Sequence, residues 1–320
     1  MMSRMIGRRP ALRAVAAMAA AGAGLGRGDV ARAEEQVPYS SGVERPELRA
    51  PANACDCHMH TYDSRFPVAA SATLRPPDAH VDDYRRLQRR LGTTRNVVVT
   101  PSTYGTDNRC TLDALGQLGA GARGVAVVDT SVADDELRRL ADQGVRGIRF
   151  NLVQAGATTV DTLEPLARRV EPLAWHVQIH MLGDQIAQIG DLLARLPAPV
   201  VFDHLGRVPQ PAGEQHPAYR VIRGLLDQGR AWVKLSGAYM DSRVGPPYAD
   251  ATALAKAYVA AAPERLVWGS DWPHPTVPVD KKPDDALLFD LLAEWAPDAA
   301  TRERILVRNP EVLYGFPASA

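Results

Sequence analysis

The feature that most constrains the fold is a regular alternation between short β-branched runs and longer stretches of helical periodicity. Strand-like runs occupy residues 54–60, 95–102, 123–130, 145–151, 175–180, 199–204, 231–236 and 266–271. Amphipathic helical patterns occupy residues 82–92, 134–144, 163–173, 183–196, 219–229 and 250–262. Eight strands alternating with helices over roughly 250 residues predict a single-domain α/β protein, a (β/α)8 TIM barrel. A doubly wound open sheet is the alternative, but no glycine-rich phosphate-binding fingerprint follows the first run.

The amino-terminal segment differs from the rest of the chain. Arg8 and Arg9 precede a small apolar run, and residues 31–33 have the small-x-small pattern of a signal-peptidase site. We therefore expect residues 1–33 to be a twin-arginine-type signal peptide cleaved near Ala33, although Ala11 stands where such signals carry a bulky apolar residue. This predicts a periplasmic protein; the alternative is an alanine-rich tail on a cytoplasmic one. Residues 34–50 are polar and predict an arm, which leaves residues 51–317 for the barrel.

Composition narrows the range of partners. The chain has 320 residues, 37 basic and 37 acidic side chains, and hydrophobic residues make up 46%. Balanced charge without a basic block after the leader argues against nucleic-acid binding. No later segment has the length and apolarity to span a bilayer. We expect a small-molecule substrate as the partner, and a homo-oligomer is compatible with the sequence.

Polar residues gather where the predicted strands end. The first run ends in His58 and His60, and strand alternation predicts that Asp56 shares their face. The later runs end in Arg149, Asn151, His180, Asp203, His204, Lys234, Ser236 and Asp271. In a TIM barrel the carboxyl ends of the strands form the active site. Because buried polar groups in a core each need a partner, the joint pattern indicates a functional site.

These motifs resemble the amidohydrolase superfamily. The resemblance rests on "DCHMH" at 56–60, "HVQIH" at 176–180, "VFDHLGR" at 201–207 and "VWGSDWPHP" at 267–275, and it extends from about Pro51 to Phe316. The likeness is to the branch of sugar and muconic-type lactonases and lactone isomerases. It implies a barrel fold and chemistry on a lactone ring.

The resemblance implies catalytic roles for Asp271, His204, His180 and Arg149. Opening a lactone requires a nucleophilic water, a base and positive charge at the carbonyl oxygen. Asp271 is the candidate base, and His180 or His204 would orient water or substrate. Arg149 would polarise the carbonyl or pair with a substrate carboxylate. The alternative for Arg149 is that it neutralises Asp56 or Asp271 within the protein.

A metal centre is a further expectation. One divalent ion, with zinc as the first candidate, would find nitrogen and oxygen ligands in His58, His60, His180 and Asp271. The resemblance leaves a metal-free mechanism open, because the branch includes both metal-using and metal-free lactonases. Two-metal members of the superfamily use a modified lysine at the end of strand four. Arg149 and Asn151 occupy that place here, so a bridged pair of ions is not expected.

The loops after the strands carry candidates for substrate binding. Donors and acceptors suited to a compact polar substrate are Ser102, Tyr104, Asn108, Asn151, Arg207 and Lys234. Asn108 could equally cap the helix that follows it. His274 is expected to be a structural loop residue, and His80 and His216 to lie on the surface.

Together these observations predict a hydrolase that opens a small, oxygen-rich, anionic lactone with water activated by Asp271. A lactone isomerase, which moves the acyl group between two hydroxyls of one aldaric acid, is the alternative. A decarboxylase of the same superfamily is the third candidate. A binding protein that kept the barrel but lost its chemistry is the alternative from another class, and the retained Asp271 and histidines argue against it.

Overall fold

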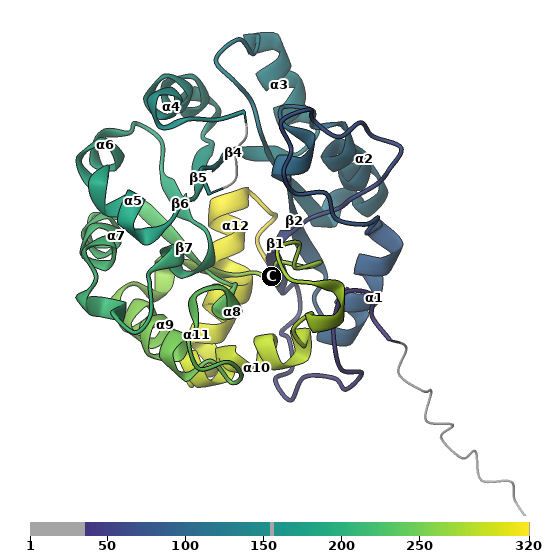
Figure 1. The fold of residues 1–320 in the computed structure, drawn as a ribbon, viewed down its shortest axis with the longest axis vertical. Helices are drawn as coiled ribbons and strands as arrows, with labels where there is room; N and C mark the ends of the chain where they lie inside the picture. Colours follow the sequence, from purple (N-terminus) through teal and green to yellow (C-terminus); the bar gives the residue numbers. More distant parts are fainter. Residues whose placement is uncertain (1–35, 154–156, 320) are drawn as a thin grey trace, which may run out of the picture. The chain divides into compact units, whose positions relative to one another are not determined.

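Eight parallel strands form one sheet in the order β1 to β8, and they make a nearly closed barrel (Figure 1). The computed structural model describes residues 36–153 and 157–319, so the predicted signal peptide lies outside the described residues. The strands are β1 (Cys55–Met59), β2 (Arg95–Val99), β3 (Ala122–Ala126), β4 (Val145–Asn151), β5 (His176–His180), β6 (Val200–Phe202), β7 (Ala231–Leu235) and β8 (Leu266–Trp268). The barrel confirms the predicted fold and excludes the open, doubly wound sheet.

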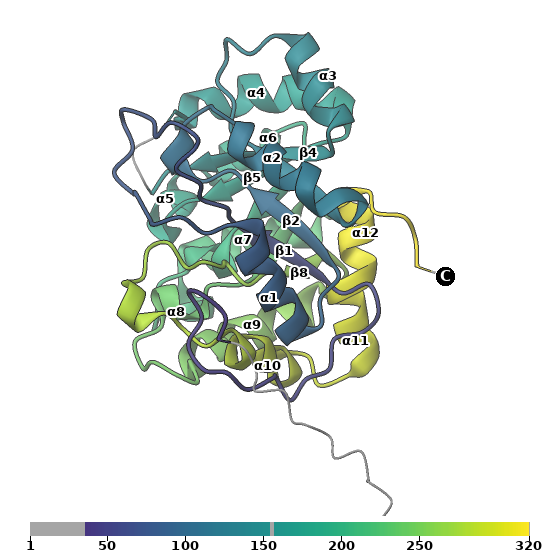
Figure 2. The same ribbon diagram turned by 90° about the vertical axis from the view of Figure 1, so that its right-hand side faces the viewer.

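Helices surround the strands (Figures 1 and 2). They are α1 (Val81–Leu91), α2 (Arg109–Leu118), α3 (Asp134–Asp142), α4 (Leu163–Val170), α5 (Gly183–Gln188), α6 (Gly190–Arg195), α7 (Pro217–Asp227), α8 (Ala238–Asp241), α9 (Ala249–Ala261), α10 (Asp285–Trp295), α11 (Ala299–Glu303) and α12 (Asn309–Tyr314). On α1, Tyr84 and Leu87 show the three-to-four spacing of an apolar face that packs on the strands. The helix predicted at 183–196 is instead two helices, α5 and α6, which meet at Ile189.

Backbone contacts join β1 to the segment that follows β8. The amide of Asp271 donates to the carbonyl of His58 at 2.8 Å, and the amide of His60 donates to the carbonyl of Trp272 at 2.8 Å. Gly269 permits this approach, because a Cβ there would lie 2.6 Å from the Cβ of His58. The junction therefore places the carboxylate predicted as a base beside the first pair of histidines.

Apolar side chains fill the amino-terminal half of the barrel. Cys55, Cys57, Val97 and Val99 belong to one buried cluster that also contains Tyr314 of α12. Figure 2 shows α12 on one side of the strands and α8 on the other. The packed end is thus separated from the strand ends that carry the polar residues.

Asp56 does not share a face with His58, contrary to the expectation from simple alternation. The pairing of β1 with β2 shifts register between Asp56 and Met59, so alternation is interrupted within the strand. The Asp56 carboxylate lies on the helix side, where it accepts hydrogen bonds from the hydroxyls of Tyr84 at 3.0 Å and Ser270 at 2.6 Å. Burial raises the pKa of Asp56 to about 6, although these hydrogen bonds oppose the shift.

The described part of the predicted arm, residues 36–50, has neither helix nor strand but packs closely on the barrel. The Trp272 indole donates to the carbonyl of Pro38 at 2.7 Å, and the guanidinium of buried Arg90 donates to the carbonyl of Glu44 at 2.7 Å. The arm therefore covers the turn that follows β8. Within the described residues, the structure contains no helix long and apolar enough to cross a membrane.

Candidate active site

The carboxylate of Asp271 lies at the centre of the strand ends. Its Oδ1 is 3.5 Å from Nε2 of His58, 3.5 Å from Nε2 of His60 and 3.7 Å from Nε2 of His204. Its Oδ2 accepts a hydrogen bond from the hydroxyl of Tyr239 at 2.6 Å. The φ of Asp271 is +65°, a conformation that costs energy in a residue with a Cβ. The chain is thus held in an unfavourable turn that directs this carboxylate at three imidazoles.

Hydrogen bonds at the far side of two rings indicate which nitrogen faces Asp271. Nδ1 of His60 is 2.7 Å from the carbonyl oxygen of Val99, which only accepts, so this nitrogen carries the proton. Nδ1 of His58 lies 3.2 Å from Oδ1 of Asp203, an ion-pair contact without hydrogen-bond geometry, and 3.2 Å from Nζ of Lys234. With the proton of His58 on Nδ1, three acceptors face one another without a donor between them, an arrangement that a cation would satisfy. In the other tautomer His58 accepts from Lys234 and donates through Nε2 to Nε2 of His60 at 3.3 Å, and no ion is needed.

His58, His60 and Asp271 fit one divalent ion. Their ligand atoms lie within 4.8 Å of one another, and two imidazoles with a carboxylate are donors that zinc accepts while keeping a position for water. His180, the fourth predicted ligand, is not part of this group. Its Nε2 lies 2.9 Å from the guanidinium of Arg207, which only donates, so the neutral ring carries its proton on Nδ1. This geometry favours His180 as a hydrogen-bond donor rather than a metal ligand.

A buried layer of charged groups supports the site from below. Asp203 lies 3.4 Å from Nε of Arg149 and 3.6 Å from Nζ of Lys234, and its Oδ2 accepts from Gln178 at 3.1 Å. Burial opposes ionisation of Asp203, but the positive groups around it hold its pKa well below the ordinary value. The carboxylate partner of Arg149 is thus Asp203, and not Asp56 or Asp271 as the alternative from sequence proposed.

Burial disfavours protonation of three imidazoles of the site. It lowers the pKa of His204 to about 4 and holds the pKa values of His58 and His180 well below their ordinary value. Nδ1 of His204 lies 2.9 Å from the hydroxyl of Ser236, which orients the ring. Neutral rings can take part in proton transfer or bind an ion.

Asp271 is ionised in this environment. Burial alone would raise its pKa, but attraction to the imidazoles of His204, His60 and His58, when these rings carry a proton, outweighs that effect and holds the pKa of Asp271 well below its ordinary value. An anionic Asp271 can accept a proton from water or hold a cation.

The pocket beside Asp271 is narrow. It is lined by His60, Tyr62, Leu74, Pro101, Ser102, Arg149, Asn151, His180, His204, Met240, Asp271, Pro275 and Thr276. The empty space between these residues is about 330 Å³, of which about 20 Å³ is open to the centres of water molecules.

Two of the six predicted substrate-binding residues, Ser102 and Asn151, line this pocket. The hydroxyl of Tyr104 instead accepts from the amide of Asp63 at 2.8 Å. Asn108 precedes α2, but its side chain does not cap that helix. It exchanges hydrogen bonds with the backbone of Val127 at 2.8 and 2.9 Å, and so it ties two strand ends together.

The other two predicted ligands lie among protein partners. Lys234 is completely buried and donates to the carbonyl of Cys57 at 2.9 Å and to Gln178 at 2.7 Å. The guanidinium of Arg207 pairs with Asp241 through two hydrogen bonds of 2.7 and 3.1 Å. These contacts favour positioning roles for both residues over direct substrate contact.

Sequence reasoning missed two tyrosines. Tyr62 lines the pocket, and its buried hydroxyl has no hydrogen-bond partner within the part of the chain that the structure describes. It follows His60 by two residues, so the alternation that indicated the histidines could also have indicated Tyr62. Tyr239 belongs to the short helix after β7, and no sequence pattern connects it with Asp271.

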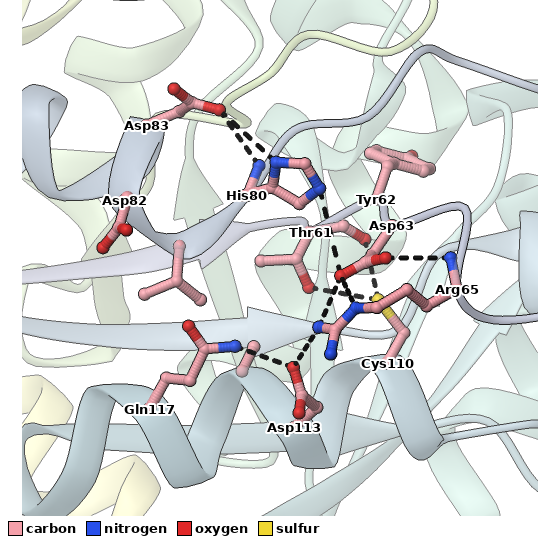
Figure 3. Close-up of a pocket in the computed structure, with 12 residues that line it drawn as sticks. Thr61, Tyr62, Asp63, Arg65, His80, Asp82, Asp83, Cys110, Asp113 and Gln117 are labelled. Atoms are coloured by element: carbon pink, nitrogen blue, oxygen red, sulfur yellow. Dashed lines mark hydrogen bonds and ion pairs between the residues drawn. The ribbon is translucent and has the colours of Figure 1, made fainter.

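A second hollow of about 310 Å³ lies beside α1 and α2 (Figure 3). Its charged side chains pair mainly with one another: Arg65 lies 2.6 Å from Asp63 and 3.0 Å from Asp113, and His80 lies 3.9 Å from Asp63. The side chain of His80 is about half exposed, at 49%, as expected from the sequence. The charged side chains of this hollow are therefore paired with one another. Fewer of them are buried than around Asp271.

A barrel whose strand ends gather imidazoles, a buried carboxylate and a buried guanidinium is typical of an enzyme that acts on a small polar molecule. Comparison with known protein families identifies the class of enzyme. The chain belongs to the amidohydrolase family, because residues 55–316 match the family described as Amidohydrolase. The resemblance stated from the motifs is thereby confirmed.

The most informative relatives have names that refer to lactone chemistry. A 4-sulfomuconolactone hydrolase of Rhizobium radiobacter is 38% identical over 83% of this chain and 91% of its own length. A 2-pyrone-4,6-dicarboxylate hydrolase of Comamonas testosteroni is 36% identical over 84% and 92%. A D-galactarolactone isomerase of Agrobacterium fabrum is 33% identical over 84% and 93%. An apo crystal structure from Agrobacterium tumefaciens superposes with a TM-score of 0.82, at 32% identity, over 88% of this chain and 99% of that one.

Proposed function

We propose that this amidohydrolase opens a small, oxygen-rich, anionic lactone by hydrolysis, with Asp271 as the base. The observation that carries the proposal is the position of Asp271 Oδ1, 3.5 Å from both His58 and His60 in a pocket that Arg149 also lines. The names of the two hydrolase relatives support a cyclic ester as the substrate. Arg149 supports an anionic one, since its planar fork suits a carboxylate.

In the proposed reaction, the water oxygen bonds to the carbonyl carbon of the lactone while Asp271 accepts a proton from that water. The ring C–O bond then breaks, and the leaving alkoxide oxygen takes the proton back from Asp271. Negative charge that develops on the carbonyl oxygen is stabilised by donors of the pocket, for which Arg149 and the hydroxyl of Tyr62 are candidates. The products are the open hydroxy acid and, near neutral pH, one released proton.

His58, His60 and Asp271 are the residues that would hold a divalent ion, for which we propose zinc. When bound, such an ion polarises a carbonyl oxygen and lowers the pKa of a coordinated water. Asp203 contributes by orienting the ring of His58, and the Val99 carbonyl does the same for His60. His204 and His180 stay available to orient water or substrate.

The test is proton release in a pH-stat over a panel of aldonolactones, aldarolactones and muconolactones. We expect one proton for each lactone opened, and loss of this signal in Asp271→Asn. The matched control is Asp142→Asn, which removes an exposed carboxylate on α3. Unchanged traces for every lactone with correctly folded protein would refute the hydrolase assignment.

A lactone isomerase is the second candidate. The similarity to the isomerase from Agrobacterium fabrum supports it. Isomerisation uses the same electrophilic site but must exclude water from the ring. NMR of the product separates the two activities. A second ring size at unchanged mass identifies an isomerase, an open acid identifies a hydrolase, and evolved carbon dioxide would identify a decarboxylase.

We also propose that the chain is exported to the periplasm after cleavage near Ala33. The proposal rests on the arginine pair and the small-residue pattern before Glu34. Cell fractionation followed by amino-terminal sequencing tests it: a periplasmic chain beginning near Glu34 is expected, and an intact cytoplasmic chain would contradict export. That the protein forms a homo-oligomer stays a prediction, which the oligomeric state of the same purified protein in solution would test.

A further inference from the structure

A chain of buried hydrogen bonds leads from Asp271 away from the pocket. The hydroxyl of Tyr239 donates to Oδ2 of Asp271 at 2.6 Å and lies 3.1 Å from Nδ1 of His274. Nε2 of His274 lies 3.1 Å from Oδ2 of Asp285. His274 and Asp285 are both completely buried. The chain therefore runs through four side chains to a carboxylate that does not line the pocket.

The direction of these hydrogen bonds follows from the chemistry of the groups. A carboxylate only accepts, so His274 donates to Asp285 through Nε2, and Tyr239 donates its single proton to Asp271. The phenolic oxygen can then accept from Nδ1 of His274 only when both nitrogens of that ring carry protons, because Nε2 already donates to Asp285. Hydrogen bonds to ionised groups are stronger than neutral ones, so the two carboxylates fix the orientation of the residues between them.

Three separate segments supply the chain of hydrogen bonds. Tyr239 comes from α8 after β7, His274 from the loop after β8, and Asp285 from the first turn of α10. The backbone reinforces the arrangement, since the amide of His274 donates to the carbonyl of Asp271 at 2.7 Å. His274 has a φ of +55°, so it shares the strained conformation of Asp271. Strain at both ends of this short loop persists only where the surrounding contacts impose it.

We propose that Tyr239 is a positioning residue for Asp271, held in turn by His274 and Asp285. With Oδ2 fixed by the tyrosine, Oδ1 is the oxygen presented to the imidazoles of His58, His60 and His204. Tyr239 does not line the pocket, so it acts through Asp271 and not on the substrate. The inference rests on the proposed function, in which Asp271 is the base and a candidate metal ligand.

The test compares Tyr239→Phe with the full-length protein in two assays. We expect kcat on an accepted lactone to fall by about 10- to 100-fold with KM within about twofold, and zinc affinity measured by chelator competition to fall by about tenfold. The matched control is Tyr314→Phe. It removes another buried hydroxyl, one without a hydrogen-bond partner among the described residues, at the packed end of the barrel. This control should change neither quantity.

The second variant, His274→Asn, removes the imidazole that contacts Tyr239. We expect it to lower kcat and zinc affinity less than Tyr239→Phe does. Tyr239→Phe with wild-type kcat, KM and zinc affinity would overturn the proposal, and so would a rise in KM at constant kcat. If the wild-type protein opens no lactone and binds no zinc, the proposed function fails first and the positioning role fails with it. If the wild-type protein opens a lactone but binds no zinc, the effect of Tyr239→Phe on kcat alone decides whether Tyr239 positions Asp271.

Discussion

Replacement of Lys234 by methionine tests whether the layer beneath the site is structural. Lys234 is completely buried and donates to Cys57 at 2.9 Å and to Gln178 at 2.7 Å. It also lies 3.6 Å from the carboxylate of Asp203. Methionine has a similar length, so the change removes the charge and the donors without opening a large cavity.

The expected cost follows from the partners that are left behind. The Cys57 carbonyl and the Gln178 side chain each lose a donor, at about 1–3 kcal/mol for a buried group. Asp203 keeps Arg149 at 3.4 Å but loses its second cation, and breaking a buried ion pair costs about 3–5 kcal/mol. Because these effects overlap, we expect Lys234→Met to lower the free energy of unfolding by about 4 kcal/mol in total.

Urea unfolding at pH 7 measures this loss. With a slope of about 3 kcal/mol per molar, the midpoint should fall by about 1.3 M. The control is Lys256→Met, which removes an exposed lysine 2.9 Å from Glu294 and should cost at most about 1 kcal/mol. Equal midpoint shifts for the two variants would refute the structural role of Lys234 and revive its assignment as a substrate ligand.

Three further predictions concern the site and its surroundings. Asp271→Asn should lower kcat by orders of magnitude while the circular dichroism spectrum stays unchanged; retention of more than a tenth of the activity would contradict its role as base. Dialysis against a chelator should abolish turnover and added zinc should restore it, whereas full activity in protein that elemental analysis shows to be metal-free would establish the metal-free route. Burial raises the pKa of Asp56 from 3.8 to about 6, so its contribution to stability is complete below about pH 4 and is lost as pH rises through 6. In urea unfolding, Asp56→Asn should therefore lower the free energy of unfolding more at pH 4 than at pH 7.5, by about 2 kcal/mol, and a pH-independent loss would exclude the shift.

The strands and most helices could be predicted because their signals are local. Each β-branched run lies at a strand, since a parallel strand covered on both faces is almost continuously apolar. The helix α10 was not predicted because its sequence, "DALLFDLLAEW", is apolar around most of its circumference and lacks a clear periodic face. The break between α5 and α6 falls at Ile189 and Gly190, but an isolated glycine within an otherwise periodic run does not by itself mark a helix end.

The site was predictable where it depends on strand ends and not where it depends on packing between segments. His60, His204 and Asp271 converge as the barrel topology requires. Lys234 likewise stands near the end of a predicted strand. Its side chain nevertheless lies below the pocket, because it extends along the barrel interior toward Gln178. The hydrogen-bond partner of His180 is Arg207, from the turn after β6. Hydrophobic periodicity in the sequence does not indicate such a pairing between side chains.

The close contact between β8 and β1 explains how distant segments make one site. Gly269 lets the chain pass so near His58 that the next residues hydrogen bond to β1, and the turn at Asp271 then has its carboxylate facing the imidazoles. The histidines and the aspartate form one site only because this contact brings them together. The same contact that closes the barrel therefore assembles the charges of the site, so substitutions that loosen the β8–β1 junction should affect stability and catalysis together.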